Sequence, residues 1–282
     1  FFFKQKTAYE IRNCDWSSDV CSSDLNTLMK HIAKKKFGQN FLKDTSIIHA
    51  IIQSINPLLD DLIIEIGPGL GALTKPLLEK TNHLLAIELD RDIVSWMEKE
   101  YSKKNITIFN EDVLNFNFNQ FGQKIRIVGN LPYNISTPIL FKCIDNIANI
   151  KDLHFMLQKE VVDRMIANPS TSEYGRLSVM LQYYFAMEHL VHVPKESFDP
   201  EPKVESSFVR LIPYEHYPFV ANNIEQFEKI VKEAFSQKRK TIRNTLKSFI
   251  SENDFQKIGI NPQLRAENLS VSDFVKISNY LD

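Results

Sequence analysis

The chain has little cysteine, almost no net charge and no long apolar run. Two of its three cysteines, Cys14 and Cys21, lie in an unusual N-terminal segment, and only Cys143 lies outside it. One cysteine excludes an internal disulfide framework and a zinc site built from cysteines. No stretch reaches the roughly 18 to 20 consecutive apolar residues that a membrane helix needs, and no signal peptide is evident. We therefore expect a cytoplasmic protein with one large domain and one small one.

The first 25 residues differ from the rest of the chain. They follow neither helical nor strand periodicity, and their Ser-Ser-Asp repeat is typical of a loop or of disorder. They also resemble the translated read-through of a sequencing adapter. We expect residues 1–25 to be foreign to the protein, whose own sequence begins near Asn26, with Met29 as a candidate start. Without their three basic and four acidic residues, the formal net charge changes from −1 to zero.

Charge is unevenly distributed in spite of this balance. Basic residues gather at positions 30–36 and again near the end of the chain, at Lys238, Arg239, Lys240 and Arg243. Short basic runs are most often solvated surface. Two such runs that frame a catalytic domain are also suited to holding an RNA backbone. The sequence leaves both interpretations open.

Short apolar segments alternate with amphipathic ones from residue 62 onward. This alternation is typical of an α/β fold with a parallel sheet. Two later apolar runs fit a closing hairpin, which would complete a seven-stranded sheet. Strands are predicted at residues 62–66, 84–88, 106–109, 125–128, 153–157, 189–193 and 208–212. Between them, helices are predicted up to residue 80 and at residues 92–101 and 137–147.

The strand pattern stops after Pro213. Helical spacing follows at residues 224–235, 241–250 and 271–281. We therefore expect two domains: residues 26–215 with the sheet, and residues 216–282 as a small all-helical domain.

A glycine turn follows the first predicted strand, in the sequence Glu65-Ile66-Gly67-Pro68-Gly69-Leu70-Gly71. Glycine lets the backbone turn tightly and lets a ligand lie against it. Glu88 ends the second strand, where a carboxylate can accept hydrogen bonds from both hydroxyls of a ribose. Asp112, after the third strand, is either an acceptor for the adenine amino group of the same cofactor or a cap. NAD and S-adenosylmethionine both carry adenosine, so a dehydrogenase is not excluded.

The sequence Asn130-Leu131-Pro132-Tyr133 follows the fourth predicted strand. It resembles the signature of amino-group methyltransferases that act on nucleobases. The adenine amino nitrogen is a poor nucleophile because its lone pair is delocalised into the ring. Acceptors at the Asn130 amide and the Leu131 carbonyl would free that lone pair, and Pro132 would keep the turn rigid. Tyr133 offers a face on which an extruded adenine can stack.

Further motifs match in order those of the ribosomal RNA adenine dimethyltransferases, and the chain is similar to this family over residues 34–280. They are the K-x-x-G-Q-x-F-L-like entry at residues 36–42, the glycine turn, E-L-D at 88–90, E-D at 111–112, N-L-P-Y-N-I-S-T at 130–137, the F-x-P-x-P-x-V-x-S-like loop at 198–206 and the basic segment at 235–244. The resemblance implies a Rossmann-like seven-stranded class I methyltransferase domain with a C-terminal helical domain for RNA recognition.

The resemblance also implies site residues, with S-adenosylmethionine as cofactor. The cofactor positions are Gln39, Asn40, Leu42, Gly67, Gly69, Glu88, Leu89, Asp112, Val113 and Asn130, where Leu89 and Val113 flank the adenine. Phe198 is placed against the target base opposite Tyr133, although a core role is as well supported. The chain is closest to the small-subunit type, which dimethylates two adjacent adenosines in the 3′-terminal hairpin loop of 16S rRNA. The antibiotic-resistance type, which acts on large-subunit rRNA, usually has isoleucine at the place of Leu131.

Two rival functions remain beside this one. A dehydrogenase would account for the glycine turn and Glu88, but it leaves residues 130–133 without a role. A non-catalytic ribosome-assembly protein on the same fold is the other rival, although an intact Asn130 and Tyr133 favour retained chemistry. The histidines follow no ligand spacing, so we expect no metal. The expected partner is small-subunit rRNA or a pre-30S particle, bound by a monomer.

Overall fold

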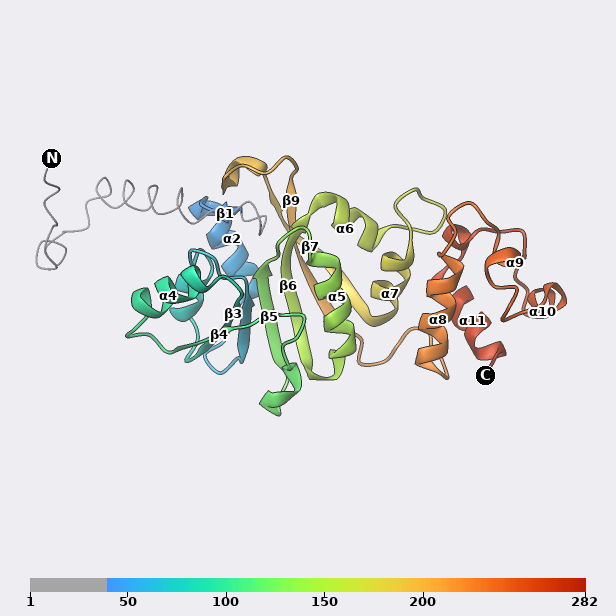
Figure 1. Ribbon diagram of the computed structural model, residues 1–282, viewed down its shortest axis with the longest axis horizontal. Helices are drawn as coiled ribbons and strands as arrows, with labels where there is room; N and C mark the ends of the chain where they lie inside the picture. The colour runs from blue at the N-terminus through green and yellow to red at the C-terminus, as the bar shows by residue number, and fades with distance from the viewer. Residues whose placement is uncertain (1–39) are drawn as a thin grey trace, which may run out of the picture. The chain divides into compact units, whose positions relative to one another are not determined.

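A mixed sheet of seven strands forms the centre of the computed structural model, which describes residues 40–282 (Figure 1). Its strand order is β4-β3-β2-β5-β6-β9-β7, in which the first five are parallel and β9 pairs antiparallel with both of its neighbours, β6 and β7. The predicted sheet and its closing antiparallel pair are thereby confirmed. The bounds are β2 Ile63–Ile66, β3 Leu84–Glu88, β4 Ile106–Asn110, β5 Ile125–Asn130, β6 Ile150–Gln158, β7 Phe185–Val193 and β9 Ser206–Pro213.

The sheet is covered on both faces, which explains its continuous apolar strands. Successive residues of a strand point to opposite faces, and β2 shows this directly. Ile63 packs in one apolar cluster with α2 (Thr45–Ile55) and α3 (Thr74–Leu78). Ile64 packs in a second cluster with α5 (Ser136–Asp145) and α7 (Arg176–Tyr184). The remaining helices of this part are α4 (Arg91–Glu100) and α6 (Lys159–Ile166).

Several elements were not predicted from the sequence. Helices α2, α6 and α7 are among them, as is a two-stranded antiparallel ribbon of β1 (Phe41–Leu42) and β8 (Phe198–Asp199). Two-residue strands carry no detectable period, so no pattern could have revealed the ribbon. The ribbon pairs Leu42 with Phe198 and so joins the start of the described chain to the segment before β9.

The C-terminal part is helical, as predicted. It contains α8 (Ile224–Ala234), α9 (Ile242–Thr245), α10 (Glu252–Lys257) and α11 (Val271–Tyr280). The predicted helix at residues 241–250 was wrong beyond Thr245. The chain turns there so that Leu246 and Ile250 are both buried. A new helix then starts at Ser251, whose hydroxyl caps the Asp254 N–H at 3.2 Å.

The helical part shares its core with the sheet part. The ring of Tyr183 in α7 lies 4.4 Å from that of Phe227 in α8 and 5.1 Å from that of Tyr217, measured between centroids. One apolar cluster continues from β2 through α7 into α11. Residues 40–282 accordingly form one compact unit. A separate function for residues 216–282 stays a prediction.

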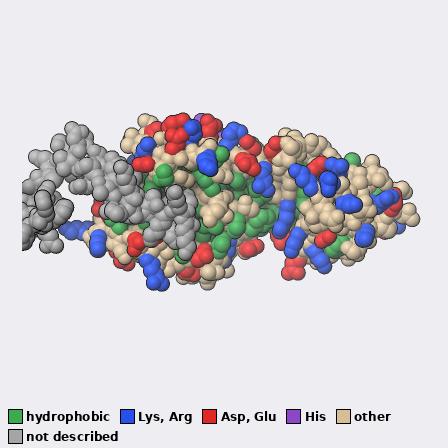
Figure 2. Space-filling view, turned by 45° about the horizontal axis from the view of Figure 1, so that its top comes forward, with side chains coloured by type: hydrophobic (Ala, Val, Ile, Leu, Met, Phe, Trp, Pro, Cys, Tyr) green, Lys and Arg blue, Asp and Glu red, His purple; other side chains and the backbone are tan. Residues whose placement is uncertain are grey.

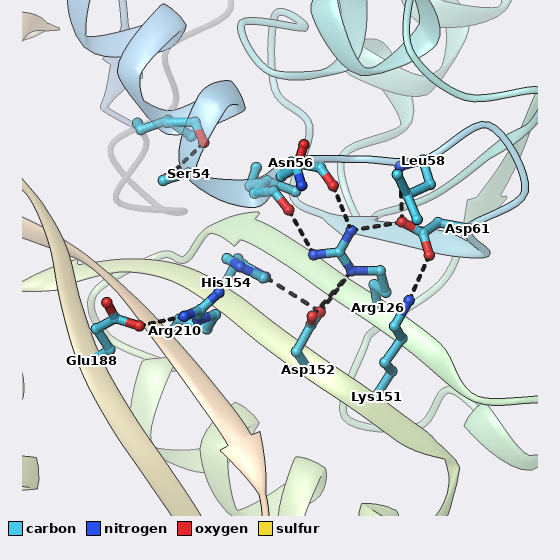
Figure 3. Close-up of polar contacts among 12 residues, drawn as sticks. Ser54, Asn56, Leu58, Asp61, Arg126, Lys151, Asp152, His154, Glu188 and Arg210 are labelled. Carbon is cyan, nitrogen blue, oxygen red and sulfur yellow. Dashed lines mark hydrogen bonds and ion pairs between the residues drawn. The ribbon is translucent and has the colours of Figure 1, made fainter.

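A buried ionic cluster around Arg126 fastens the edge of the sheet at which β5 begins (Figure 3). The Arg126 guanidinium lies 2.7 Å from Asp61 and 2.9 Å from Asp152, and it donates to the Ile55 carbonyl at 2.7 Å. Lys151 pairs with Asp61 at 2.8 Å on the outer side. These contacts join α2, the start of β2 and the start of β6. The cluster therefore leaves the opposite edge of the sheet, where the parallel strands end, free of these contacts.

Candidate active site

The predicted site residues meet at the carboxyl ends of the parallel strands. Ligands bind at this edge in open α/β sheets. The glycine turn follows β2, Glu88 is the last residue of β3, and Asn130 is the last residue of β5. Their convergence here follows from strand order, because β2 lies between β3 and β5.

The turn after β2 requires its glycines. Gly67, Gly69 and Gly71 have φ values of 64°, 54° and 79°, in the left-handed region that side chains rarely adopt. A Cβ atom on Gly71 would lie 2.1 Å from the Tyr101 hydroxyl, and one on Gly69 would lie 3.1 Å from the Phe41 ring. The turn therefore packs so closely against Tyr101 and Phe41 that a side chain at Gly71 would not fit and one at Gly69 would be tight.

Glu88 presents a buried carboxylate beside this turn. Its side chain is 7% exposed, and the Asp90 N–H donates to Oε1 at 2.9 Å. Burial raises the pKa of Glu88, while N–H bonds from Asp90, Gly69 and Leu89 oppose the rise. Among residues 40–282 no cation pairs with it. A carboxylate held in this way fits the two hydroxyls of a ribose, so the residues present suit an adenosine-containing cofactor.

Two polar side chains near Glu88 were given no role in the sequence analysis. Asn110, the last residue of β4, donates from Nδ2 to the main-chain carbonyls of Glu88 at 3.0 Å and Leu89 at 3.2 Å. Glu65 is 2% exposed in β2 and accepts a 2.6 Å hydrogen bond from Thr74 at the start of α3. Burial raises the pKa of Glu65 to about 7, and nearby Glu88 contributes to the rise. A charged residue inside an apolar strand was the signal that could have revealed Glu65.

The adenine side of the predicted pocket is only partly polar. Leu89 is half exposed and Val113 is buried. Asp112 Oδ1 accepts a 2.9 Å hydrogen bond from the Leu114 N–H, so this carboxylate does cap a turn. Its contact with the adenine amino group of a cofactor stays a prediction. Of the entry motif, Asn40 and Leu42 lie at this edge, while Gln39 lies outside the described residues.

Asn130 has a fixed amide orientation. Its Nδ2 donates to the Asn40 carbonyl at 3.0 Å, so Oδ1 faces away from that contact as an acceptor. Among the described residues no donor occupies Oδ1. Leu131 is 1% exposed and its N–H donates to Met156 of β6 at 3.2 Å. These bonds hold the residues that follow β5 to the neighbouring chain segments.

Tyr133 is half buried beside Asn130, behind the rigid Pro132. Its hydroxyl and that of Ser206 lie 2.8 Å apart, and burial raises its pKa. The Ile135 N–H donates to the Pro132 carbonyl at 3.1 Å, which closes the turn before α5. The ring of Tyr133 is thus held at one end by its hydroxyl.

Phe198 belongs to the core in this structure. Its side chain is 1% exposed and packs in the apolar cluster with Leu42, Ile51 and Phe208. Of the two roles that the sequence left open, the structure therefore displays the core role. Contact with a target base stays a prediction.

The basic residues of the C-terminal part lie on an exposed turn. Lys238, Arg239 and Lys240 connect α8 to α9, and Arg243 lies in α9. Arg243 pairs with Glu252 at 3.3 Å, whereas no ion pair involves the other three within residues 40–282. Figure 2 shows Lys and Arg side chains gathered over the C-terminal helices. The basic run at residues 30–36 lies outside the described residues.

Strand order separates the two enzyme classes that the glycine turn left open. Dinucleotide-binding sheets continue with parallel strands, whereas here β9 is inserted between β6 and β7 and is antiparallel to both. This sheet, with Asn130–Tyr133 at the end of β5, is that of the S-adenosylmethionine-dependent methyltransferases. A sequence profile described as ribosomal RNA adenine dimethylase matches residues 30–282. The chain therefore belongs to the ribosomal RNA adenine dimethylase family, and S-adenosylmethionine is its methyl donor.

Individual relatives agree with this assignment. The chain is 56% identical over 253 residues to ribosomal RNA small subunit methyltransferase A of Methylobacillus flagellatus, which covers 90% of this chain and 99% of the relative. The protein of that name from Neisseria meningitidis is 54% identical over 254 residues, with 90% and 98% coverage. A dimethyladenosine transferase structure from Plasmodium falciparum has a TM-score of 0.71 at 27% identity, covering 84% of this chain and 95% of that chain. The 23S rRNA methyltransferase ErmE shares the fold, with a TM-score of 0.67 at 24% identity and coverage of 86% and 100%.

Two kinds of feature are absent from the described part of the chain. Over residues 40–282, no helix combines the length and apolar character needed to cross a membrane. In the same range, no three His, Cys, Asp or Glu side chains are grouped so as to hold a metal ion.

Proposed function

We propose that this enzyme dimethylates the N6 amino groups of two adjacent adenosines in the 3′-terminal hairpin loop of small-subunit rRNA. High identity to relatives named small subunit methyltransferase A supports this target. The observation that carries the chemistry is the fixed amide of Asn130. We propose as partner the rRNA itself or a pre-30S particle, bound by a monomer in the cytoplasm without a metal.

The proposed chemistry requires that the adenine nitrogen be made nucleophilic. S-adenosylmethionine supplies a methyl group bound to a positively charged sulfur. Asn130 Oδ1 and the Leu131 carbonyl accept hydrogen bonds from the two N–H bonds of the amino group and draw it toward tetrahedral geometry. The nitrogen lone pair is then localised for attack. Each transfer would form one N–C bond and break the bond between that methyl group and the sulfur, which keeps the electron pair. It would also release one proton, which the acidic methylated amino group can lose to water without a general base.

The target base must leave its stack before it can react. Stacking of a base on an aromatic ring is worth about 1–3 kcal/mol, and the Tyr133 ring is held for that purpose by its hydroxyl contact with Ser206. Pro132 keeps the turn short and offers no N–H to compete for the base. We assign Phe198 a supporting role, in which its buried ring packs under the site.

We assign cofactor binding to the predicted set around the glycine turn. Gly67 and Gly69 provide close backbone approach, Glu88 accepts from the ribose, and Asp112 accepts from the adenine amino group between Leu89 and Val113. Asn40 and Leu42 close the site from the N-terminal side, with Gln39. The exposed turn with Lys238, Arg239 and Lys240, together with Arg243, would bind RNA phosphates.

Transfer of labelled methyl groups to small ribosomal subunits that lack the modification tests the function. We expect up to four methyl groups per subunit, all on the two adjacent adenosines. Labelling of large subunits instead would identify the resistance-type activity. Binding to small subunits without any transfer would identify a non-catalytic assembly factor.

A further inference from the structure

A shallow cleft lies between the target site and the basic turn, and no part of the proposed mechanism uses it. Its volume is about 350 Å³. Helix α6 and the segment that follows it provide its walls, and α6 lies beside the carboxyl end of β6 (Figure 1). The side chains used below are those of Lys159, Asp163, Ile166, Asn168, Thr171 and Glu173.

One end of the cleft adjoins Tyr133. The Tyr133 hydroxyl contacts Ser206, and Ser206 is paired with Gln158 in the sheet. The next residue, Lys159, donates its N–H to the Glu205 carbonyl at 3.0 Å and lines the cleft. Tyr133 and the Lys159 end of the cleft are therefore linked through the paired residues Ser206 and Gln158.

The other end of the cleft adjoins the C-terminal part. The Ser170 N–H donates to the Glu267 carbonyl at 2.7 Å, and Asn268 donates to the Ser170 hydroxyl at 3.2 Å. Lys238 of the basic turn interacts electrostatically with Glu173. The cleft thus lies on the path between the target base and the cations proposed to hold phosphates.

The chemistry of the cleft favours a base over a phosphate. Asp163 pairs with Lys159 at 2.6 Å through Oδ2, which offsets the charges of both side chains and leaves Oδ1 as an acceptor. Glu173 is a second carboxylate, which repels phosphate and accepts hydrogen bonds from base N–H groups. Glu173 is fully exposed, and its pKa is lowered chiefly by a hydrogen bond from the Ser172 hydroxyl. Ile166 is 51% exposed and offers an apolar surface to the face of a base. The Asn168 side chain is exposed and adds an amide that can donate and accept.

We propose that this cleft binds an unpaired nucleobase next to the target adenosine, through its N–H groups on Glu173 and Asp163 and its face on Ile166. This inference rests on the proposed function, because it names a second contact with the same RNA. Recognition of splayed, single-stranded bases by apolar surfaces and edge hydrogen bonds is general in RNA loops. The cleft would then select the sequence context of the target and not its chemistry.

Removal of the negative charge of Glu173 tests the proposal, because a binding site and a solvated surface predict opposite changes in the affinity for RNA. If the cleft were only solvated surface, Glu173→Ala would leave RNA binding unchanged or strengthen it, because a negative charge near phosphates is removed. If Glu173 instead accepts a hydrogen bond from a base, its removal should raise the KM for small ribosomal subunits severalfold. The kcat at saturation and the affinity for S-adenosylmethionine should stay the same. Ile166→Ala should raise KM in the same direction.

Glu79→Ala is the matched control. Glu79 is an exposed carboxylate at the C-terminal end of α3, at the edge of the sheet opposite the target site. We expect the KM of the Glu79→Ala variant for small ribosomal subunits to equal that of the unaltered enzyme. An unchanged or lowered KM for both cleft variants, in an enzyme that still methylates small subunits, overturns the cleft proposal alone. Loss of methylation by the unaltered enzyme would instead overturn the proposed function.

A crosslink identifies the occupant. The photoreactive residue p-benzoylphenylalanine at position 171 should crosslink to the small subunit on irradiation. We expect the crosslinked nucleotide, mapped by primer extension, to lie within about two nucleotides of the target adenosines. A crosslink to a ribosomal protein, or to rRNA distant from the target, overturns the proposal.

Discussion

The side-chain amide of Asn130 donates a 3.0 Å hydrogen bond to the main-chain carbonyl of Asn40. This contact uses the amide nitrogen and leaves the amide oxygen as the group that can face a substrate. It also joins the predicted catalytic residue to the first described residue of the entry motif. One hydrogen bond thus links the residue that we propose as a cofactor contact, Asn40, to the one that we propose activates the target nitrogen, Asn130.

Glu88→Ala should weaken the binding of S-adenosylmethionine without unfolding the protein. Two ribose hydroxyls donating to a charged acceptor contribute about 1.5–3 kcal/mol each, so the affinity should fall at least tenfold. Isothermal titration calorimetry measures this directly. Glu98→Ala, at an exposed carboxylate of α4, serves as the control. Equal affinities in both variants would remove Glu88 from the cofactor site.

Glu65→Gln should stabilise the protein at pH 8 but not at pH 4.5. The pKa of Glu65 is raised from 4.5 to about 7, so the folded state holds its proton more tightly than the unfolded state does. Protonated Glu65 therefore contributes to the free energy of unfolding in full below about pH 4.5. This contribution, up to about 3 kcal/mol, is lost as the pH rises toward 7. Glutamine is neutral throughout and retains an acceptor for Thr74. Urea unfolding at both pH values should therefore show a larger gain at pH 8, whereas an equal difference at both would contradict a neutral Glu65.

Tyr133→Ala and Tyr133→Phe should differ strongly. Alanine removes the ring that stacks on the extruded adenine, worth about 1–3 kcal/mol, and we expect about a ten- to hundredfold loss in kcat/KM. Phenylalanine keeps the ring and loses only the contact with Ser206, so a loss of a few-fold is expected. Steady-state methylation of small subunits measures both. Equal losses would mean that the hydroxyl, and not the ring, is what the reaction needs.

Charge reversal of Lys238, Arg239 and Lys240 should weaken RNA binding and flatten its salt dependence. Each lost phosphate contact lowers the slope of log K against log salt by about 0.9 for duplex and about 0.7 for single-stranded contacts. The affinity for S-adenosylmethionine should not change, because the turn lies in the C-terminal part. Reversal of Lys103 and Lys104, two exposed lysines between α4 and β4, is the matched control. If both sets behave alike, the turn is ordinary solvated surface.

The sequence predicted the sheet better than its surroundings. Strand β3 and the glycine turn were evident because apolar runs and glycines are local signals. The ribbon that buries Phe198 was not, because its two short strands pair residues that are far apart in the chain. The role of Asn110 was also hidden, since it depends on which strand lies next to which. The helix predicted at residues 241–250 was too long, because spacing alone does not show where a chain must turn to bury Leu246.

Single-turnover methylation of small ribosomal subunits by Asn130→Ala, at saturating enzyme and cofactor, tests the central claim most directly. The amide oxygen acts mainly as the methyl group moves, so its contribution belongs to the transition state. Loss of one such positioned group typically costs on the order of a hundredfold or more in rate. The account predicts that loss, with RNA affinity nearly unchanged and cofactor affinity reduced modestly through the lost contact with Asn40. A near-normal rate would contradict the account, because some other group would then activate the adenine nitrogen.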